Sequence, residues 1–134
     1  MTTYIKKGYK QLLQEANSEI KTISVDEAKS LFENDGYEFI DLRDFREIKR
    51  NGKIPGSFSC PRGMLEFWID PDSPYHKEIF STGKNFIFYC ASAWRSALAA
   101  KAAQDMGMEN VSHIKGGFSN WEQSGGKIEK LQAN

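Results

Sequence analysis

Apolar residues along this chain follow two different spacings, and their alternation predicts the order of the secondary structure. In residues 6–19 and 96–106 the apolar side chains recur at the spacing of an amphipathic helix. Short apolar and aromatic runs instead predict buried strands. These runs cover residues 37–42, 57–60, 85–89 and 111–114.

Start and stop signals predict further helices between these strands. Ser24 is followed three residues later by Glu27, the spacing of a capping box, so a helix is expected over residues 25–34 and its end at Gly36. Gly107 supplies the stop after residues 96–106. Short helices are also expected at residues 64–69 and 75–80, and after Gly116 and Gly117.

The alternation of helices and strands favours an α/β fold with a largely parallel sheet and helices on both faces. A length of 134 residues suits one domain with a single core. Ligands of such sheets bind outside the carboxyl ends of the strands, where both Asp41 and Cys90 are expected.

Composition excludes several classes of partner. Eighteen basic residues balance eighteen acidic ones, so the overall charge attracts neither nucleic acid nor an anionic membrane. No stretch is apolar enough to span a bilayer, and the first residues do not resemble a signal peptide, so a cytoplasmic protein is expected.

Cysteine and histidine usage gives no reason to expect a metal or another cofactor. Cys60 and Cys90 are too few for a disulfide framework or a four-ligand zinc site. His76 and His113 form no spaced pair with a cysteine or a carboxylate cluster, so both are interpreted as surface or edge histidines.

Cys90 is the candidate for chemistry. It follows an apolar strand and is followed, after four residues, by Arg95 and a predicted helix. A loop that leads from a strand into a helix points backbone N–H groups inward, and the helix dipole adds partial positive charge there. The pattern therefore predicts a thiolate held in an anion-binding loop.

Four separated motifs, taken in order, resemble the rhodanese-like sulfurtransferase domain. They span about residues 23–126, and two positions depart from the family pattern: Lys53 replaces a usual histidine and Ser57 a usual alanine, changes expected to alter packing rather than chemistry. The motifs are Asp41-Leu42-Arg43, residues 52–57, Cys90 with Arg95, and Gly116-Gly117-Phe118 with Trp121.

The resemblance implies a rhodanese-like fold with about five strands in residues 22–134, preceded by a helical extension in residues 1–21. It also implies that Cys90 takes the outer sulfur from a donor such as thiosulfate, keeps it as a persulfide and passes it to a thiophilic acceptor. That acceptor is a thiol or cyanide, with a thioredoxin-like or sulfur-carrier protein as a further candidate. The implied sulfur-binding residues are Ala91, Ser92, Ala93, Trp94 and Arg95.

Several side chains near the predicted site have two interpretations. Arg95 either adds charge at the donor's sulfonate end or anchors the loop by pairing with a carboxylate. Asp41 is expected to fix neighbouring loops, Trp94 to narrow the entrance, and Cys60 to be a core residue, with a resolving thiol as the alternative. Arg43 and Arg62 are candidates for lining the mouth and attracting an anionic donor, with simple solvation at the surface as the alternative.

Two other functions compete with sulfur transfer. A phosphatase or arsenate reductase also places a cysteine and an arginine around a loop of N–H donors, but related phosphatases of this fold have one more residue between the two. A noncatalytic binding module commonly lacks the cysteine, which this chain keeps. Because Ala91, Ser92 and Ala93 carry no charge, thiosulfate is expected to be a poor substitute for the physiological donor.

Overall fold

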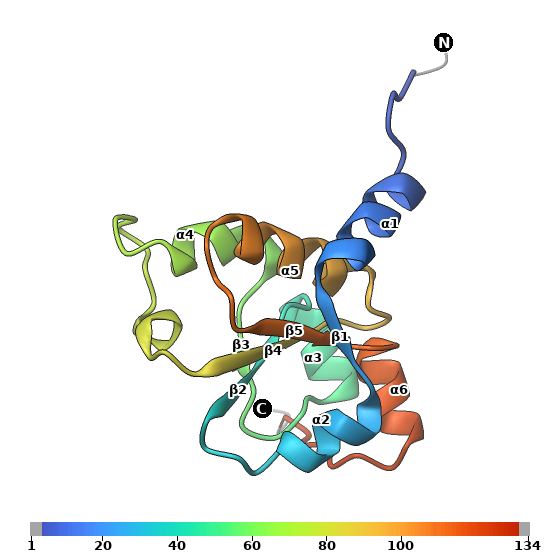
Figure 1. Cartoon of the computed structure of the whole chain (residues 1–134). Helices are drawn as coiled ribbons and strands as arrows, with labels where there is room; N and C mark the ends of the chain where they lie inside the picture. Colours follow the sequence, from blue (N-terminus) through green and yellow to red (C-terminus); the bar gives the residue numbers. More distant parts are fainter. Residues whose placement is uncertain (1–3, 132–134) are drawn as a thin grey trace.

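Five strands pair side by side, all parallel, in the order β1-β5-β4-β2-β3 (Figure 1). The computed structural model describes residues 4–131. The central strand β4 pairs with β2 on one side and β5 on the other, which confirms the α/β fold with a parallel sheet. The strands are β1 Lys21–Ile23, β2 Tyr37–Asp41, β3 Phe58–Ser59, β4 Asn85–Tyr89 and β5 Val111–Ile114.

Helices cover both faces of this sheet (Figure 1). Residues of α4 and α5 pack in the core of one face, and residues of α2 and α6 in the core of the other. The leading helix α1 packs against α5. The α-helices are α1 Tyr9–Glu19, α2 Val25–Leu31, α3 Phe45–Asn51, α4 Leu65–Ile69, α5 Trp94–Asp105 and α6 Gly117–Gln123, with 3₁₀ turns at Arg62–Met64 and Glu78–Ser81.

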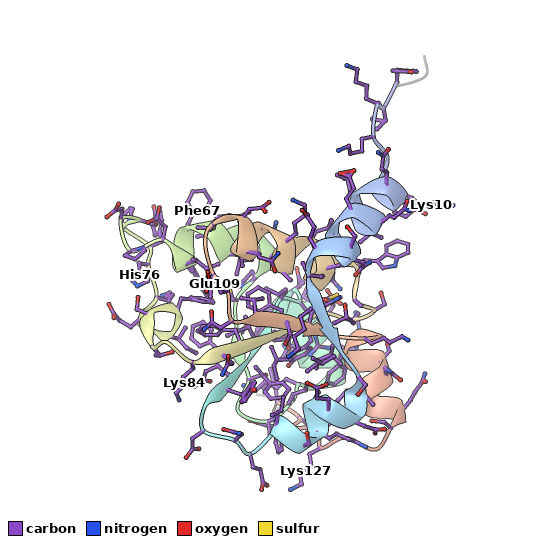
Figure 2. The ribbon with its side chains drawn as sticks, in the orientation of Figure 1. Lys10, Phe67, His76, Lys84, Glu109 and Lys127 are labelled. Atoms are coloured by element: carbon purple, nitrogen blue, oxygen red, sulfur yellow. The ribbon has the colours of Figure 1, made fainter. Side chains whose placement is uncertain are left out.

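The alternation of side chains along β4 divides the core into two layers. Phe86 and Phe88 enter the layer under α4 and α5, whereas Ile87 and Tyr89 enter the layer under α2 and α6. Burying an aromatic or branched side chain of this size stabilises the fold by about 1.5–3 kcal/mol. Charged side chains such as Lys10 and Lys127 lie on the periphery instead (Figure 2).

Helix α3 was not among the predicted elements, although its start carries a clear signal. The Asp44 carboxylate accepts a hydrogen bond from the Arg46 N–H at 2.7 Å, and the Glu47 carboxylate accepts one from the Asp44 N–H at 3.3 Å. A reciprocal capping box of this kind was expected at Ser24. The Ser24 hydroxyl accepts from the Glu27 N–H at 3.0 Å, but the Glu27 carboxylate does not accept from the Ser24 N–H.

Two other segments differ from the prediction. The helix expected over residues 75–80 is reduced to the 3₁₀ turn Glu78–Ser81, because the Lys77 N–H donates to the Trp68 carbonyl at 3.0 Å and ties this segment back to α4. The edge strand β1 was not predicted, because its three residues are too few to give a periodic signal.

The predicted N-terminal extension, residues 1–21, contains α1, and its residues 1–3 lie outside the described residues, as do residues 132–134 of the predicted domain. Within residues 4–131, no helix has the length and apolar character needed to cross a membrane.

The start of α6 lies unusually close to the segment that follows β4. Gly117 has φ +63°, and a Cβ atom there would lie 2.6 Å from the Cys90 carbonyl oxygen. Only glycine adopts this conformation without strain and also allows this approach. The position therefore brings the backbone of α6 into direct contact with Cys90 and Ala91.

We predict that Gly117→Ala lowers the free energy of unfolding by about 2–4 kcal/mol, because it adds steric overlap to the strain of a positive φ. Gly56→Ala is the matched control, since Gly56 has φ +76° but a Cβ atom added there would meet no heavy atom within 4 Å. The control is expected to lose only about 1 kcal/mol. Urea unfolding measures both, and equal losses would contradict the close approach.

Candidate active site

Cys90 lies at the carboxyl end of the central strand, and its loop is held from outside by α6. The Phe118 N–H donates to the Cys90 carbonyl at 2.8 Å, and the Ser119 N–H donates to the Ala91 carbonyl at 3.1 Å. These bonds fix the two carbonyl groups toward α6. Because successive peptide groups in such a turn point their N–H groups to the opposite side, the loop is left with donors on its inner side.

The N–H groups of residues 91–95 donate no hydrogen bond to any other group within residues 4–131. The turn that gathers them is made at Ala93, whose φ of 77° is the only positive value at a non-glycine residue in the same range. An alanine in this conformation costs about 1–2 kcal/mol. The amino terminus of the twelve-residue helix α5 lies at this point, so the free donors and the helix dipole favour an anion here.

The Cys90 sulfur lies at the base of this loop, and the residue is 1% exposed. The Ser96 N–H donates to Cys90 Sγ at 3.4 Å, and the Ser96 Oγ lies 3.6 Å from the same sulfur. Within residues 4–131, the hydrogen-bonding partner of this sulfur is therefore Ser96, through its N–H group and its hydroxyl.

Arg95 makes a bidentate ion pair with Glu47 of α3, at 2.7 and 2.9 Å. The Arg95 guanidinium holds the pKa of the Glu47 carboxyl below its ordinary value. Arg95 was expected either to bind the donor or to anchor the loop by pairing with a carboxylate. The structure shows the second arrangement, since the pair connects the loop to α3 and occupies two guanidinium nitrogens.

Arg43 does not line the mouth of the site, contrary to expectation. It is 1% exposed, and its guanidinium donates to the Asp41 carboxylate at 2.8 and 3.0 Å and to the Gly52 carbonyl at 2.7 Å. The same group lies 4.1 Å from the centre of the Phe118 ring. These partners stabilise the buried guanidinium charge of Arg43, so the side chain stays inside the domain.

Asp41 is the centre of a buried polar cluster rather than a group facing the loop. Its carboxylate also accepts a hydrogen bond from the Tyr89 hydroxyl at 2.8 Å. Ser57, one of the two departures from the family pattern, lies 2.9 Å from that hydroxyl, and the Ile54 N–H donates to it at 3.2 Å. The cluster joins β2, β4 and the turn before β3.

The remaining candidates, Arg62 and Trp94, have different surroundings. Arg62 pairs with Glu66 one helical turn later, at 2.9 Å. Trp94 is 57% exposed and packs against Tyr9 of α1, with the ring centres 5.2 Å apart. The structure thus places the indole between the loop and the leading helix.

Cys60 is a core residue and forms no disulfide. Burial raises the pKa of the Cys60 thiol to about 12, so it stays protonated at neutral pH. A protonated, buried thiol is a poor partner for a resolving reaction.

The sequence interpretation missed three side chains near the loop. Glu47 could have been found from its capping-box spacing to Asp44. Ser96 and His113 form a hydrogen bond of 2.9 Å next to Cys90, and no local sequence signal connects them. The interpretation of His113 as a surface or edge histidine is wrong, because it is 2% exposed on β5, an interior strand of the sheet. Within residues 4–131, no three His, Cys, Asp or Glu side chains gather as metal ligands would.

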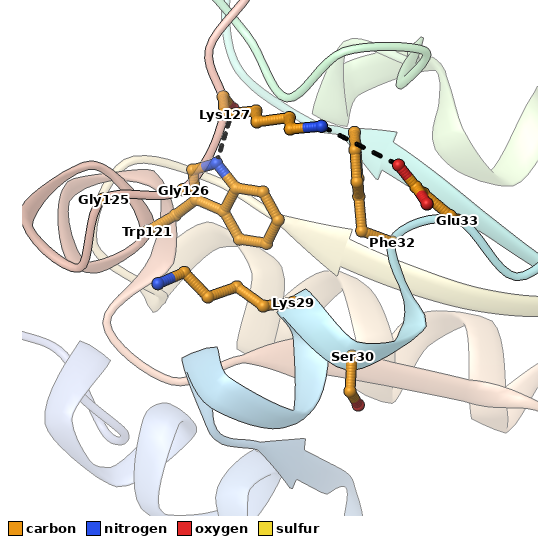
Figure 3. A pocket seen from close by; sticks show the side chains of 8 residues that line it. All are labelled: Lys29, Ser30, Phe32, Glu33, Trp121, Gly125, Gly126 and Lys127. Carbon is orange, nitrogen blue, oxygen red and sulfur yellow. Dashed lines mark hydrogen bonds and ion pairs between the residues drawn. The ribbon is translucent and has the colours of Figure 1, made fainter.

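A cavity of about 340 Å³ lies away from the Cys90 loop, between α2 and the segment after α6 (Figure 3). Its polar groups already have partners: Lys29 donates to the Ser124 carbonyl, the Trp121 indole donates to the Lys127 carbonyl, and Lys127 pairs with Glu33. Its lining contains no cysteine. The lining residues are Lys29, Ser30, Phe32, Glu33, Trp121, Gly125, Gly126 and Lys127.

Several known proteins are similar to this chain in sequence or in structure. A mouse (Mus musculus) protein, thiosulfate sulfurtransferase/rhodanese-like domain-containing protein 3, is 29% identical over 106 residues, which cover 75% of this chain and 68% of the relative. The thiosulfate sulfurtransferase GlpE of Actinobacillus pleuropneumoniae is 28% identical over 107 residues, which cover 80% of this chain and 91% of the relative.

Among solved structures, a Rhodopseudomonas palustris protein described as of unknown function and a possible tyrosine phosphatase superposes with a TM-score of 0.94. It is 56% identical, and the match covers 96% of this chain and 99% of that chain. The family model described as "Rhodanese-like domain" matches residues 24–124, a range that holds four of the five strands, the Cys90 loop and α6. The chain therefore belongs to the rhodanese-like domain family.

Proposed function

We propose that the protein is a sulfurtransferase that carries a sulfane sulfur on Cys90. The observation that carries this proposal is the set of five consecutive free N–H groups, residues 91–95, closing a short loop around one thiol. These donors suit the terminal sulfur of a persulfide anion, which is small and singly charged. They act as an oxyanion hole does in acyl transfer, with no reorganisation needed during the reaction.

The reaction balances without a separate acid or base. The Cys90 thiolate attacks the outer sulfur of a donor such as thiosulfate, the donor's S–S bond breaks, and sulfite leaves with the electron pair. The Cys90 persulfide remains in the loop. A thiolate or cyanide acceptor then attacks the outer sulfur, and Cys90 leaves as a thiolate.

A phosphatase is the second candidate because the Rhodopseudomonas palustris protein is described as a possible tyrosine phosphatase. Two observations favour sulfur transfer over it. Only four residues separate Cys90 from Arg95, whereas related phosphatases have five. In addition, Arg95 is held by Glu47 and does not present a free fork to a phosphate group.

The charged side chains around the loop provide little net positive charge to attract a compact dianionic donor. The three arginines considered at sequence level are all paired with carboxylates: Arg43 with Asp41, Arg62 with Glu66 and Arg95 with Glu47. A hollow of about 500 Å³ beside the loop is lined by three arginines and two carboxylates, so its net charge is small. A small-molecule persulfide, whose charges are spread over a larger molecule, fits these surroundings better than thiosulfate, a compact dianion. The proposed acceptor is a small thiol or a thiol-bearing protein such as a thioredoxin-like or sulfur-carrier protein.

Incubation of the reduced protein with a sulfur donor is predicted to add about 32 Da to the peptide that contains Cys90, as measured by mass spectrometry. Cys90→Ala is expected to abolish the addition and to lower sulfur transfer at least about 1,000-fold. Cys60→Ala is the matched control and keeps both. Absence of the added mass, together with phosphate release from an aryl phosphate, would favour the phosphatase. Partner binding that survives Cys90→Ala without any transfer in the wild type would indicate a noncatalytic module.

Glutathione persulfide is predicted to give a kcat/KM about tenfold or more above that of thiosulfate, because the side chains of residues 91–93 carry no charge to attract the compact dianion of thiosulfate, whereas glutathione persulfide spreads its charges over a larger molecule. Steady-state assays with both donors and with 3-mercaptopyruvate measure the difference. A clear preference for thiosulfate would contradict this interpretation of the charges.

Arg95→Ala and Glu47→Ala are predicted to lower kcat/KM by similar factors, and the double variant is predicted to be no worse than either, because both remove one anchor. Since the pair is partly exposed, its coupling in unfolding free energy is expected to be about 0.5–1 kcal/mol. If Arg95 instead binds the donor, Arg95→Ala will raise KM and Glu47→Ala will lower it.

A further inference from the structure

A chain of hydrogen bonds leads from Cys90 through the sheet to its edge strand. Ser96 Oγ lies 3.6 Å from Cys90 Sγ and 2.9 Å from His113 Nδ1. His113 Nε2 lies 3.0 Å from Thr22 Oγ1. The register of the sheet sets the last contact, because Thr22 and His113 are direct partners in the pairing of β1 with β5.

The chain begins in the interior and ends at solvent. Ser96 is 0% and His113 2% exposed, whereas Thr22 is exposed. A hollow of about 550 Å³ lies between α1 and the back of the Cys90 loop, and Thr22, His113 and Lys115 are among the residues that line it. Water in this hollow can exchange protons with the outer end of the chain.

His113 is uncharged at neutral pH, since burial lowers its pKa to about 4. A neutral imidazole has one nitrogen that donates and one that accepts. The three contacts can therefore point in only two self-consistent directions: away from Cys90, with the proton of His113 on Nε2, or toward Cys90, with that proton on Nδ1.

We propose that Thr22, His113 and Ser96 form a proton path for Cys90, and that the tautomer of His113 follows the ionisation of the thiol. In the thiol state, Cys90 donates to Ser96, Ser96 to Nδ1, and Nε2 to Thr22. In the thiolate state, Thr22 donates to Nε2, Nδ1 to Ser96, and Ser96 to the sulfur anion. The three residues are positioning and relay groups, and Cys90 remains the nucleophile of the proposed sulfur transfer, on which this inference rests.

The conversion moves protons only. The S–H bond of Cys90 breaks and its proton passes to Ser96 Oγ, while the hydroxyl proton of Ser96 passes to His113 Nδ1. The Nε2 proton passes to Thr22 Oγ1, and the hydroxyl proton of Thr22 passes to water in the hollow. One proton leaves per cysteine, no electrons are exchanged, and no imidazolium ion has to form.

Charged groups near this path come from several elements and are already paired, with one exception. Arg95 of α5 pairs with Glu47 of α3, and Asp41 at the end of β2 pairs with Arg43. Lys115, after β5, is the charged side chain that lines the hollow within residues 4–131, while α1 contributes uncharged groups there and β4 places Phe88 beside His113. These charges therefore do not fix the direction in which the hydrogen bonds of the path point.

Thr22→Val tests the path at its exposed end, where the isosteric change leaves the core intact. The rate of Cys90 alkylation by iodoacetamide is measured from about pH 5 to about pH 10, and the midpoint of the profile is expected to rise by about 0.5–1 pH unit, a three- to tenfold loss of reactive thiolate below it. Thr22→Ser, which restores the hydroxyl, is expected to return the profile to that of the wild type. A Thr22→Val profile that coincides with the wild-type profile would overturn the proposal.

Nitrogen-15 NMR of histidine-labelled protein supplies a second test. His113 is expected to carry its proton on Nε2 below the alkylation midpoint and on Nδ1 above it, without becoming charged. His76, in the connection after α4 (Figure 2), is the internal reference: its Nδ1 lies 2.9 Å from the Trp68 carbonyl and must donate to it. A His113 that keeps one tautomer across the midpoint rejects the path. Neither test uses a sulfur donor, so failure of the path and failure of the proposed sulfur transfer are separable.

Discussion

The site depends on two backbone hydrogen bonds from α6 to the Cys90 loop. By accepting from Phe118 and Ser119, the carbonyl groups of Cys90 and Ala91 are turned away from the sulfur, and the following N–H groups remain free on the other side. Gly117 makes this contact possible because any side chain there would overlap the Cys90 carbonyl. The left-handed conformation of Ala93 completes the turn. The proposed anion binding by the loop thus rests on backbone packing rather than on the loop's side chains, which are small and uncharged at residues 91–93.

The charged side chains near the loop pair with one another and do not belong to its set of free N–H groups. Arg95 is committed to Glu47 and Arg43 to Asp41, so the two arginines closest in sequence to the motifs stabilise the framework. In the buried pair, removing either partner would leave an uncompensated charge in the interior. In the proposed function, this arrangement leaves the amide groups as the donors to the transferred sulfur, which is a small group of low charge. It also explains why the fold alone does not decide between sulfur and phosphate chemistry: the distinction rests on loop length and on what the arginine already binds.

Much of the fold could be predicted because its signals are local. The β4 run is apolar and aromatic from Phe86 to Tyr89, Ser24 and Gly107 mark helix boundaries, and Cys90 stands where a strand leads into a helix. The site could be predicted only in part. Glu47 and Arg95 are 48 residues apart, and Ser96 and His113 are 17 apart, so their contacts depend on how α3, α5 and β5 pack. Arg43 was placed at the mouth because a charged residue is usually exposed, and a buried carboxylate and an aromatic ring overrode that tendency.

The central claim is that backbone amides hold the transferred sulfur, and amide proton chemical shifts measure this most directly. In ¹⁵N-labelled protein, loading Cys90 with sulfur from glutathione persulfide should move the amide protons of residues 91–95 downfield, because each donates to the new anion, while residues around Cys60 should not move. Unchanged amide shifts across residues 91–95, in protein whose mass shows that Cys90 carries the sulfur, would contradict the account.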